Sequence, residues 1–387
     1  MKKIIICFSL LLSLFPTLTL AQETDLQDQQ TPINDAAVCE VTTKEEFETA
    51  LTAQCGEIKF LNDIDFNEIA LPYTVNNKVI NLNGFTVTSK LYQGDKPFAL
   101  SFCLEGSNFT LKNGTIKSDA DYPLFLGDAP SENILIENMV IDGGINIYAC
   151  KDVTIKNSDV NASAKNYYAL WADNNTTNIV VESGSFTSGE GATIGGTVET
   201  GETKIVVNGG TFYAKDNKEI VLDNGKGDYT VPQFNAGSFN KKPNQGVDSN
   251  TALIEVNGMY SAGETAIDVI QNSEPGTTIN IEQGIDNIDG VKPGVIINNN
   301  QESDITINGN VVTSGDEIIV PETPTVENEK LSTNQPSGYD DGGPFTTDAC
   351  GNVFDRWGNE IYHAPVCLND VSQQQSNEYT LVNTSDK

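Results

Sequence analysis

The sequence contains very few of the side chains that most often carry catalysis and metal binding. It has one histidine, His363, and one arginine, Arg356, and both lie near the C-terminus. One histidine cannot form a multi-histidine metal site, and the cysteines are too scattered for a zinc knuckle. Phosphate-binding loops and EF-hand spacings are also missing. These absences argue against a zinc enzyme and against a nucleotide-binding protein.

Positive charge is scarce along the whole chain. There are 22 basic and 54 acidic residues, which gives a formal net charge of −32 at pH 7. A chain this acidic repels nucleic acids and anionic membranes, so we expect no nucleic-acid partner. It also repels acidic polysaccharides unless calcium bridges the two.

Long apolar runs are missing everywhere except at the N-terminus. There, two lysines precede an apolar run that ends at Thr19, Leu20 and Ala21, in MKKIIICFSLLLSLFPTLTLAQ. This pattern is typical of a secretory signal peptide over residues 1–21. No later segment approaches ~20 apolar residues, so we expect no helical membrane span. The sequence predicts an exported monomer, located outside the cell, at the cell surface or in the periplasm.

The cysteine count is small but suits an exported chain. Six of the seven lie after the signal peptide: Cys39, Cys55, Cys103, Cys150, Cys350 and Cys367. Six cysteines allow fifteen connectivities. The local pairs Cys39–Cys55 and Cys350–Cys367 are the simplest disulfides, and buried thiols remain the alternative. We expect Cys103 and Cys150 to be unpaired, because two solenoid coils would separate them by ~9.6 Å.

Composition divides the chain after the signal peptide into five segments. The sequence TKEEFETAL (43–51) predicts an amphipathic helix, because Thr43 and Glu46 have capping-box spacing. The expected segments are a disordered linker (22–36), a repetitive β region with an N-terminal helical cap (37–315), a linker or strap rich in proline and acid (316–345), a disulfide-closed hairpin (346–370) and a polar tail (371–387).

Internal repetition is the main structural signal. Phrases such as NIVVESGSFTSG (178–189) and KIVVNGGTFYA (204–214) place an aliphatic pair before a tight turn. Such pairs recur about every 25 residues, with no helical pattern between copies. A period of this length with β-branched residues predicts one solenoid coil per repeat. Residues Ile155, Val181, Val207 and Ile281 should then point inward, and Asn113, Asn138 and Asn157 should stack in a structural ladder.

The repeats resemble the right-handed parallel β-helix of the pectate-lyase-like superfamily. The resemblance covers roughly residues 37–315, including the helical cap, and it implies a fold rather than an activity. Lyases of this family use calcium together with an arginine or lysine base, and its glycosidases use clustered aspartates. The paired-aspartate and glycine-histidine-glycine motifs are absent, and no arginine lies in the solenoid. We therefore assign no catalytic residue.

Two sets of polar residues remain as weaker candidates for chemistry. Lys151, Lys156 and Lys165 are available as bases, although surface lysines are usually solvated charges. The carboxylates of Asp119, Asp121 and Asp142, with Asp128 nearby, fall in consecutive coils and could bind calcium through hard oxygen ligands. In a chain with 54 acidic residues, chance clustering is the competing explanation.

Aromatic residues form the most distinctive pattern. Phe102, Phe125, Tyr148 and Trp171 are each 23 residues apart. Equal spacing in a solenoid stacks side chains above one another, which predicts an aromatic column. Alternation in GINIYAC and YALWAD directs Tyr148 and Trp171 outward, whereas FALSFCL directs Phe102 inward. The predicted ligand-binding residues are Trp171, Tyr148 and Phe125, and an aromatic stack buried in the core is the alternative.

These observations favour an exported, non-catalytic β-helix protein that binds glycans or mediates surface adhesion. The alternative is a polysaccharide lyase or glycoside hydrolase that acts in a groove on the outer face of the β-helix. A passive structural surface protein is a further possibility. No cofactor is required by the first function, and calcium is the one cofactor that the sequence suggests.

Overall fold

In the computed structural model, the chain divides into two compact units, Met1–Thr323 and Pro324–Lys387. In the first unit the structure describes residues 37–66, 72–89, 102–127, 129–173, 176–197 and 204–322. In the second unit it describes only three short strands. The predicted signal peptide, the linker 22–36, the tail 371–387 and the cysteines Cys350 and Cys367 lie outside the described residues.

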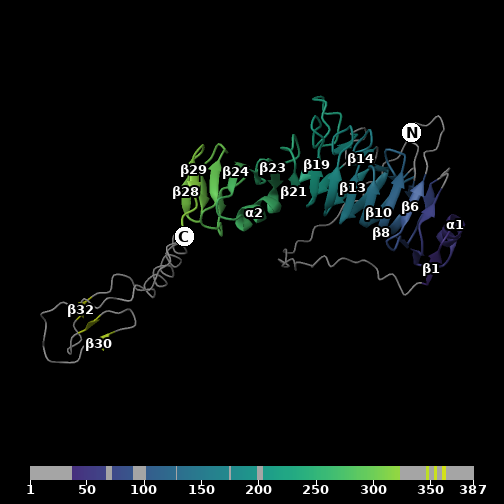
Figure 1. Cartoon of the computed structure of the whole chain (residues 1–387), viewed down its shortest axis with the longest axis horizontal. Coiled ribbons are helices and arrows are strands. Elements are labelled where there is room, and N and C mark those ends of the chain that lie inside the picture. The colour runs from purple at the N-terminus through teal and green to yellow at the C-terminus, as the bar shows by residue number, and fades with distance from the viewer. Residues whose placement is uncertain are drawn as a thin grey trace, which may run out of the picture. The chain divides into compact units, whose positions relative to one another are not determined.

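Strands are the main regular structure of the described first unit, and two helices accompany them (Figure 1). A large sheet contains β1 (Val38–Val41), β2 (Glu57–Phe60), β3 (Ile64–Asp65), β5 (Lys78–Asn81), β6 (Thr86–Ser89), β8 (Ser107–Ser118), β10 (Ser131–Asp142), β12 (Cys150–Lys156), β13 (Ser158–Asn161), β15 (Thr177–Val181), β16 (Gly184–Thr187), β18 (Ile205–Val207), β19 (Thr211–Tyr213), β20 (Gln233–Phe234), β21 (Ala236–Phe239), β22 (Leu253–Val256), β23 (Met259–Ala262), β24 (Thr278–Gln283), β26 (Ile296–Asn299) and β29 (Glu317–Ile319). A small sheet contains β4 (Tyr73–Thr74), β7 (Phe102–Glu105), β9 (Leu124–Leu126), β11 (Ile145–Tyr148), β14 (Leu170–Asp173) and β17 (Ile194–Gly196).

The predicted N-terminal helix is present as α1 (Lys44–Thr52). The Thr43 hydroxyl accepts a hydrogen bond from the Glu46 backbone N–H at 3.2 Å, as expected of an N-cap. The Glu46 carboxylate accepts from the backbone N–H and hydroxyl of Thr42, which holds the pKa of Glu46 below its usual value. Phe47 is fully buried, so the helix covers the first end of the strand stack (Figure 1).

Parallel pairing between distant residues organises the large sheet from β2 to β21. Leu111 pairs with Ile136, and further along Val181 pairs with Val207 and Val207 with Phe234. The predicted inward residues Ile155, Val181, Val207 and Ile281 are all fully buried, which confirms this part of the prediction. The all-β prediction is confirmed, and the long parallel sheets give a solenoid-like arrangement.

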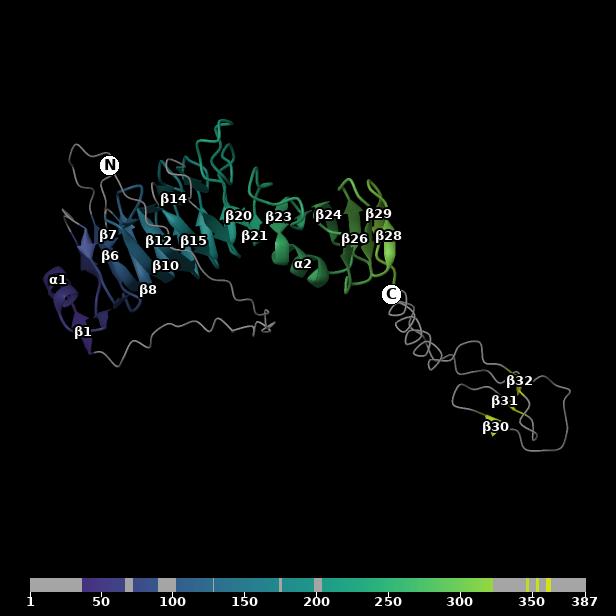
Figure 2. The same ribbon diagram turned by 180° about the vertical axis from the view of Figure 1, so that it is seen from behind.

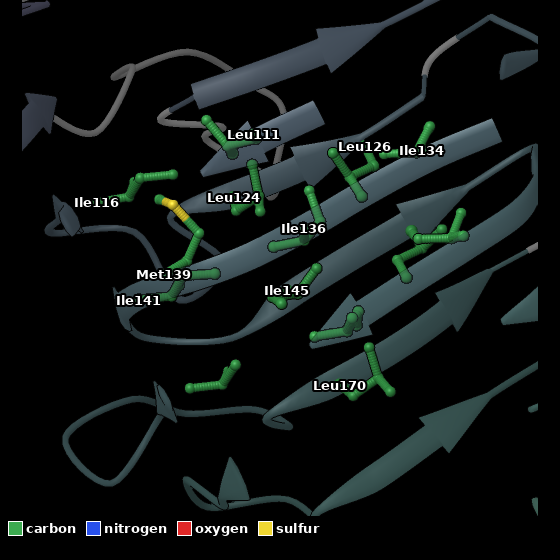
Figure 3. Packing of buried hydrophobic residues seen from close by; sticks show 14 of the residues in the cluster. Leu111, Ile116, Leu124, Leu126, Ile134, Ile136, Met139, Ile141, Ile145 and Leu170 are labelled. Atoms are coloured by element: carbon green, nitrogen blue, oxygen red, sulfur yellow. The ribbon is translucent and has the colours of Figure 1, made fainter. Parts of the chain in front are cut away.

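The core lies between the two sheets. Figure 3 shows Leu124, Ile145 and Leu170 of the small sheet in one cluster with Leu111 and Ile136 of the large sheet. All five side chains are fully buried. Burying a leucine or isoleucine side chain contributes ~1.5–3 kcal/mol, so this continuous apolar interior is the main source of stability.

Asparagines at left-handed backbone angles form ladders where the chain turns. Asn138 has φ 53° and donates a side-chain hydrogen bond to Asn113 at 3.1 Å. This confirms the predicted ladder for these two residues. Asn157 instead accepts from the Ser183 hydroxyl at 2.7 Å. A second ladder, not predicted, includes the bond from Asn133 to Asn108 at 2.9 Å.

The parallel pairing was expected to continue to residue 315, but it changes after β21. Strand β23 pairs antiparallel with both β21 and β22, and β22 pairs antiparallel with β24. An unpredicted helix, α2 (Gly263–Asn272), packs against β21, β22 and β23 (Figure 2). Beyond it, β26 pairs antiparallel with β29, and a three-stranded sheet forms from β25 (Asn287–Ile288), β27 (Ile305–Ile307) and β28 (Asn310–Val312).

The described part of the second unit is a short antiparallel sheet. It contains β30 (Thr346–Thr347), β31 (Val353–Phe354) and β32 (Glu360–Tyr362). These strands lie within the segment 346–370 for which the sequence predicts a hairpin.

The cysteines behave as predicted wherever the structure describes them. Cys39 and Cys55 form a disulfide, with their Cα atoms 5.8 Å apart. Cys103 and Cys150 are buried thiols rather than disulfide partners. The disulfide joins β1 to the segment that follows α1, so it fixes the helical cap to the first strands.

Candidate functional site

The strand register of the small sheet decides whether the aromatic residues form a column. Asn146, not Tyr148, pairs with Phe125 on one side and with Trp171 on the other. Tyr148 pairs with Asp173. The predicted column is therefore wrong, because successive partners are 21 and 25 residues apart rather than 23. Loops of different length between the strands shift the register although the sequence spacing is constant.

The predicted aromatic residues also differ in exposure. Phe102 is fully buried, as expected from its place in FALSFCL. Phe125 is only 8% exposed, whereas Tyr148 and Trp171 are partly exposed. The rings of Phe125 and Tyr148 stack with their centroids 6.3 Å apart. Phe125 therefore supports Tyr148 and presents little surface of its own.

A different set of aromatic side chains surrounds Trp171. Its indole stacks on Tyr168 with a centroid distance of 4.7 Å and an interplanar angle of 27°. Tyr168 stacks on Tyr167 at 6.4 Å, and Tyr167 stacks on Tyr122 at 5.8 Å. We refer to Tyr122, Tyr167, Tyr168 and Trp171 as the aromatic cluster. Tyr167 is 42% exposed, so the cluster reaches solvent.

Glycines hold two rings of the cluster in place. A Cβ atom added at Gly195 would lie 2.8 Å from the Trp171 indole, and one at Gly191 would lie 2.8 Å from the Tyr168 ring. Any larger residue at these positions would force the rings to move. The absence of a Cβ atom at these two glycines therefore leaves room for the Trp171 and Tyr168 rings.

Two tyrosines of the cluster, Tyr122 and Tyr168, have raised pKa values. Burial raises the pKa of Tyr122 well above its ordinary value. Burial is also the main cause that raises the pKa of Tyr168, with a smaller contribution from nearby Tyr229. At neutral pH both side chains can therefore donate hydrogen bonds, in addition to offering apolar ring faces.

Asn146 is a buried polar side chain beside the cluster. It is 3% exposed and lies in register between Phe125 and Trp171. Its Oδ1 atom is buried and has no hydrogen-bond partner in the described structure. Unsatisfied buried acceptors are uncommon and cost free energy. Alternation in GINIYAC marks Asn146 as outward-facing, but the sequence gives no sign that aromatic neighbours would bury it.

The three aspartates predicted to bind calcium are not gathered into a ligand set. Asp121 accepts hydrogen bonds from the backbone and side-chain N–H groups of Asn166, at 2.9 and 3.2 Å. Asp119 and Asp142 are exposed. Within the ranges that the structure describes, no group of three or more His, Cys, Asp or Glu residues could hold a metal ion. The calcium hypothesis has no supporting cluster there.

An open groove of about 520 Å³ lies along the large sheet, and two lysines contribute to its lining. The lining residues are Lys151, Thr177, Asn178, Lys204, Ile205, Val231 and Gln233. They come from the starts of β12, β15, β18 and β20 and from the residues just before them. The sequence singled out Lys151 but not Lys204. No residue of the aromatic cluster lines this groove.

The other candidate lysines have structural partners. Lys156 lies 3.7 Å from Glu137 in an exposed ion pair, which contributes little to stability. The Lys165 ammonium donates to the Ser118 carbonyl oxygen at 2.6 Å. This bond joins the loop before β14 to the end of β8, 47 residues earlier in the sequence. Lys165 is therefore a positioning residue for the loop that carries Tyr167 and Tyr168.

The thiol of Cys150 is not suited to nucleophilic chemistry. Burial raises its pKa to about 12, and the thiol donates a hydrogen bond to the Tyr148 carbonyl oxygen at 3.3 Å. A thiol with this pKa is protonated at neutral pH, and the thiolate is the reactive form.

Comparison with known proteins finds no matching family model, no matching curated protein and no matching solved structure. Neither α1 nor α2, the helices of the described residues, could cross a membrane.

Proposed function

We propose that this chain is an exported, non-catalytic protein that binds glycans through the aromatic cluster. We propose also that its solenoid-like sheets form a right-handed parallel β-helix of the pectate-lyase-like kind, with about 25 residues per coil. In support, successive partners in the large sheet are 25, 19, 26, 26 and 27 residues apart, in the order Leu111, Ile136, Ile155, Val181, Val207 and Phe234. An experimental structure with left-handed winding would contradict this fold.

One observation carries the binding proposal. Four aromatic side chains stack on one another in one region beside the small sheet, and one of them, Tyr167, is exposed. Sugar rings present apolar C–H faces that pack well on tyrosine and tryptophan, and the tyrosine hydroxyls can bond to sugar hydroxyls. The predicted site changes accordingly: Trp171 is kept, Tyr167 and Tyr168 are added, and Phe125 and Tyr148 form a neighbouring pair.

The charge of the chain favours a class of sugar. With a net charge of −32, it repels uronates and sulfated glycans at long range. Neutral or amino sugars are therefore the proposed ligands. A single stacked aromatic contributes only ~0.5–1.5 kcal/mol, so each contact is weak and tight binding requires several rings or several copies.

A glycan array tests this proposal. Wild-type protein should bind neutral or amino sugars, and Tyr167→Ala should weaken binding about fivefold, which corresponds to ~1 kcal/mol. Trp171→Ala should weaken it further while circular dichroism stays unchanged. Tyr213→Ala is the matched control, because Tyr213 is exposed on β19 and lies outside the cluster. Equal binding by wild type and Tyr167→Ala would refute the cluster as the site.

The second candidate function is a polysaccharide lyase or glycoside hydrolase that acts in the groove. Lys151 and Lys204 supply cationic groups there, and a lyase needs a base. The lining residues include no carboxylate, so a two-carboxylate hydrolase would need groups from elsewhere. Assays for unsaturated products and new reducing ends, on neutral and acidic polysaccharides with and without calcium, separate this function from simple binding.

A further inference from the structure

We propose that the groove lined by Lys151 and Lys204 is a second binding site, and that its ligand is an extended acidic peptide segment. This site is independent of the aromatic cluster. Two ammonium groups in one groove are unusual in a chain that has only 22 basic residues against 54 acidic ones.

The two lysines differ in how strongly they are already paired. Lys151 is exposed and lies 3.7 Å from Asp152, which is a weak surface ion pair. Lys204 is exposed just before β18, and no ion pair involves it in the described structure. A carboxylate that enters the groove therefore meets one ammonium without competition and a second that only a surface pair holds.

The strand register gives the spacing of the two lysines. Ile179 pairs with Ile205, so Lys204 is two strands away from Asp152, the neighbour of Lys151. Two strand spacings place the two lysine Cα atoms on the order of 10 Å apart. In an extended peptide, alternate side chains lie on one face about 7 Å apart. Flexible lysine side chains can span the difference and bind two carboxylates of one strand.

The other lining residues favour a peptide over a sugar. No aromatic side chain lines the groove, whereas sugar sites rely on ring stacking. Val231 is 52% exposed and offers an aliphatic contact. Asn178 donates to Asp152 and Gln233 donates to Asn235, both at 2.8 Å. Each amide still has a carbonyl oxygen and a second N–H with which to bond peptide groups.

The net negative charge of the chain does not prevent this binding. At physiological ionic strength charges are screened over about 8 Å, so a carboxylate inside the groove responds mainly to Lys151, Lys204 and the neighbouring Asp152, whose carboxylate offsets part of the attraction. More distant acidic residues reduce the rate of approach. The expected result is a modest affinity that depends on both lysines.

Fluorescence anisotropy with a labelled peptide of alternating glutamate and valine, at fixed 150 mM salt, tests the site. Wild-type protein should bind it, and should bind the glutamine–valine analogue at least tenfold more weakly. Lys204→Gln should weaken binding at least threefold, and Lys151→Gln with Lys204→Gln at least tenfold. Lys156→Gln is the control, because Lys156 is an exposed lysine of β12 outside the groove. Lys151→Arg with Lys204→Arg should retain binding.

Three outcomes would overturn the proposal. Equal loss in Lys156→Gln would show a non-specific charge effect. Failure of the wild type to bind the glutamate peptide would remove the site. Tighter binding of an oligogalacturonate with the same lysine dependence would assign the groove to an acidic polysaccharide. Trp171→Ala should leave peptide binding unchanged, so this test and the glycan test can fail separately.

Discussion

The strands from β2 to β21 and those from β22 to β29 both surround an apolar core, but they differ in how the strands pair and in which residues fill the core. In the first region, parallel pairing places like residues above one another, and Phe186, Phe212 and Phe239 stack with centroids 5.1 and 5.5 Å apart. In the second, antiparallel and parallel pairs both occur, such as β22 with β24 and β24 with β26, and together with α2 they enclose a separate core of alanine, isoleucine and valine. Phenylalanines are absent from that described core cluster.

This contrast shows what a parallel stack demands of its sequence. Parallel pairing brings similar residues into register, as at Val181 and Val207, and several turns between the strands adopt left-handed backbone angles. Asparagine occupies many of those corners, including Asn108, Asn133 and Asn178 with φ between 55° and 56°. Antiparallel hairpins need only local turns, such as Asn257–Gly258 between β22 and β23.

The largest effect should come from a charge placed inside the parallel region. Val207 is fully buried and pairs with Val181 and Phe234. Val207→Asp buries an unpaired carboxylate, so we expect it to lower the free energy of unfolding by more than ~3 kcal/mol. Urea denaturation followed by circular dichroism measures this change.

The neighbouring Val206 provides the matched control. It is partly exposed in the same strand, so Val206→Asp should change stability by about 0.5 kcal/mol or less. Similar losses for the two variants would mean that the inward and outward faces of β18 are assigned wrongly.

The sequence predicted the inward faces because alternation is a local property. Ile205 and Val207 flank Val206, and strand geometry alone directs the outer two to one side. The register between neighbouring strands also depends on the lengths of the loops that connect them, and those lengths differ from one connection to the next. The equal spacing of Phe125, Tyr148 and Trp171 was therefore misleading, and Asn146 occupies the place given to Tyr148.

The missed features had weaker signals. In GETAIDVIQN, Ala266 and Ile270 share one helical face. The helix was not predicted because Ile254 and Ile279, on either side of it, fit the repeat spacing of the strands. Alternation in YALWAD suggested that Tyr168 faces inward, yet β14 begins only at Leu170. Tyr168 lies in the preceding loop, where strand alternation does not apply, and it stacks on Trp171 instead.

The junction between the two regions should be the next most sensitive place. Gly263 has φ +55°, and a Cβ atom there would overlap the carbonyl oxygen of Asn235. Backbone cannot move aside cheaply, so Gly263→Ala should cost ~2–3 kcal/mol. Gly258, with φ +82° and no atom within 4 Å of an added Cβ, is the control, and Gly258→Ala should cost only ~1–2 kcal/mol. Thermal denaturation compares the two, and an equal loss would mean that the close approach at Gly263 is not a constraint.

The smallest effect should come from a corner of the parallel region. Asn138 donates to Asn113 at 3.1 Å and holds φ at 53°. Asn138→Gly removes the hydrogen bond but tolerates the backbone angle, so it should cost ~1 kcal/mol. Asn138→Ala removes the bond and also forces alanine into the left-handed region, which adds ~1 kcal/mol. Urea denaturation of both variants separates the two contributions. If Ala and Gly were equally destabilising, the left-handed angle would contribute nothing, and asparagine would be present at these corners for its hydrogen bond alone.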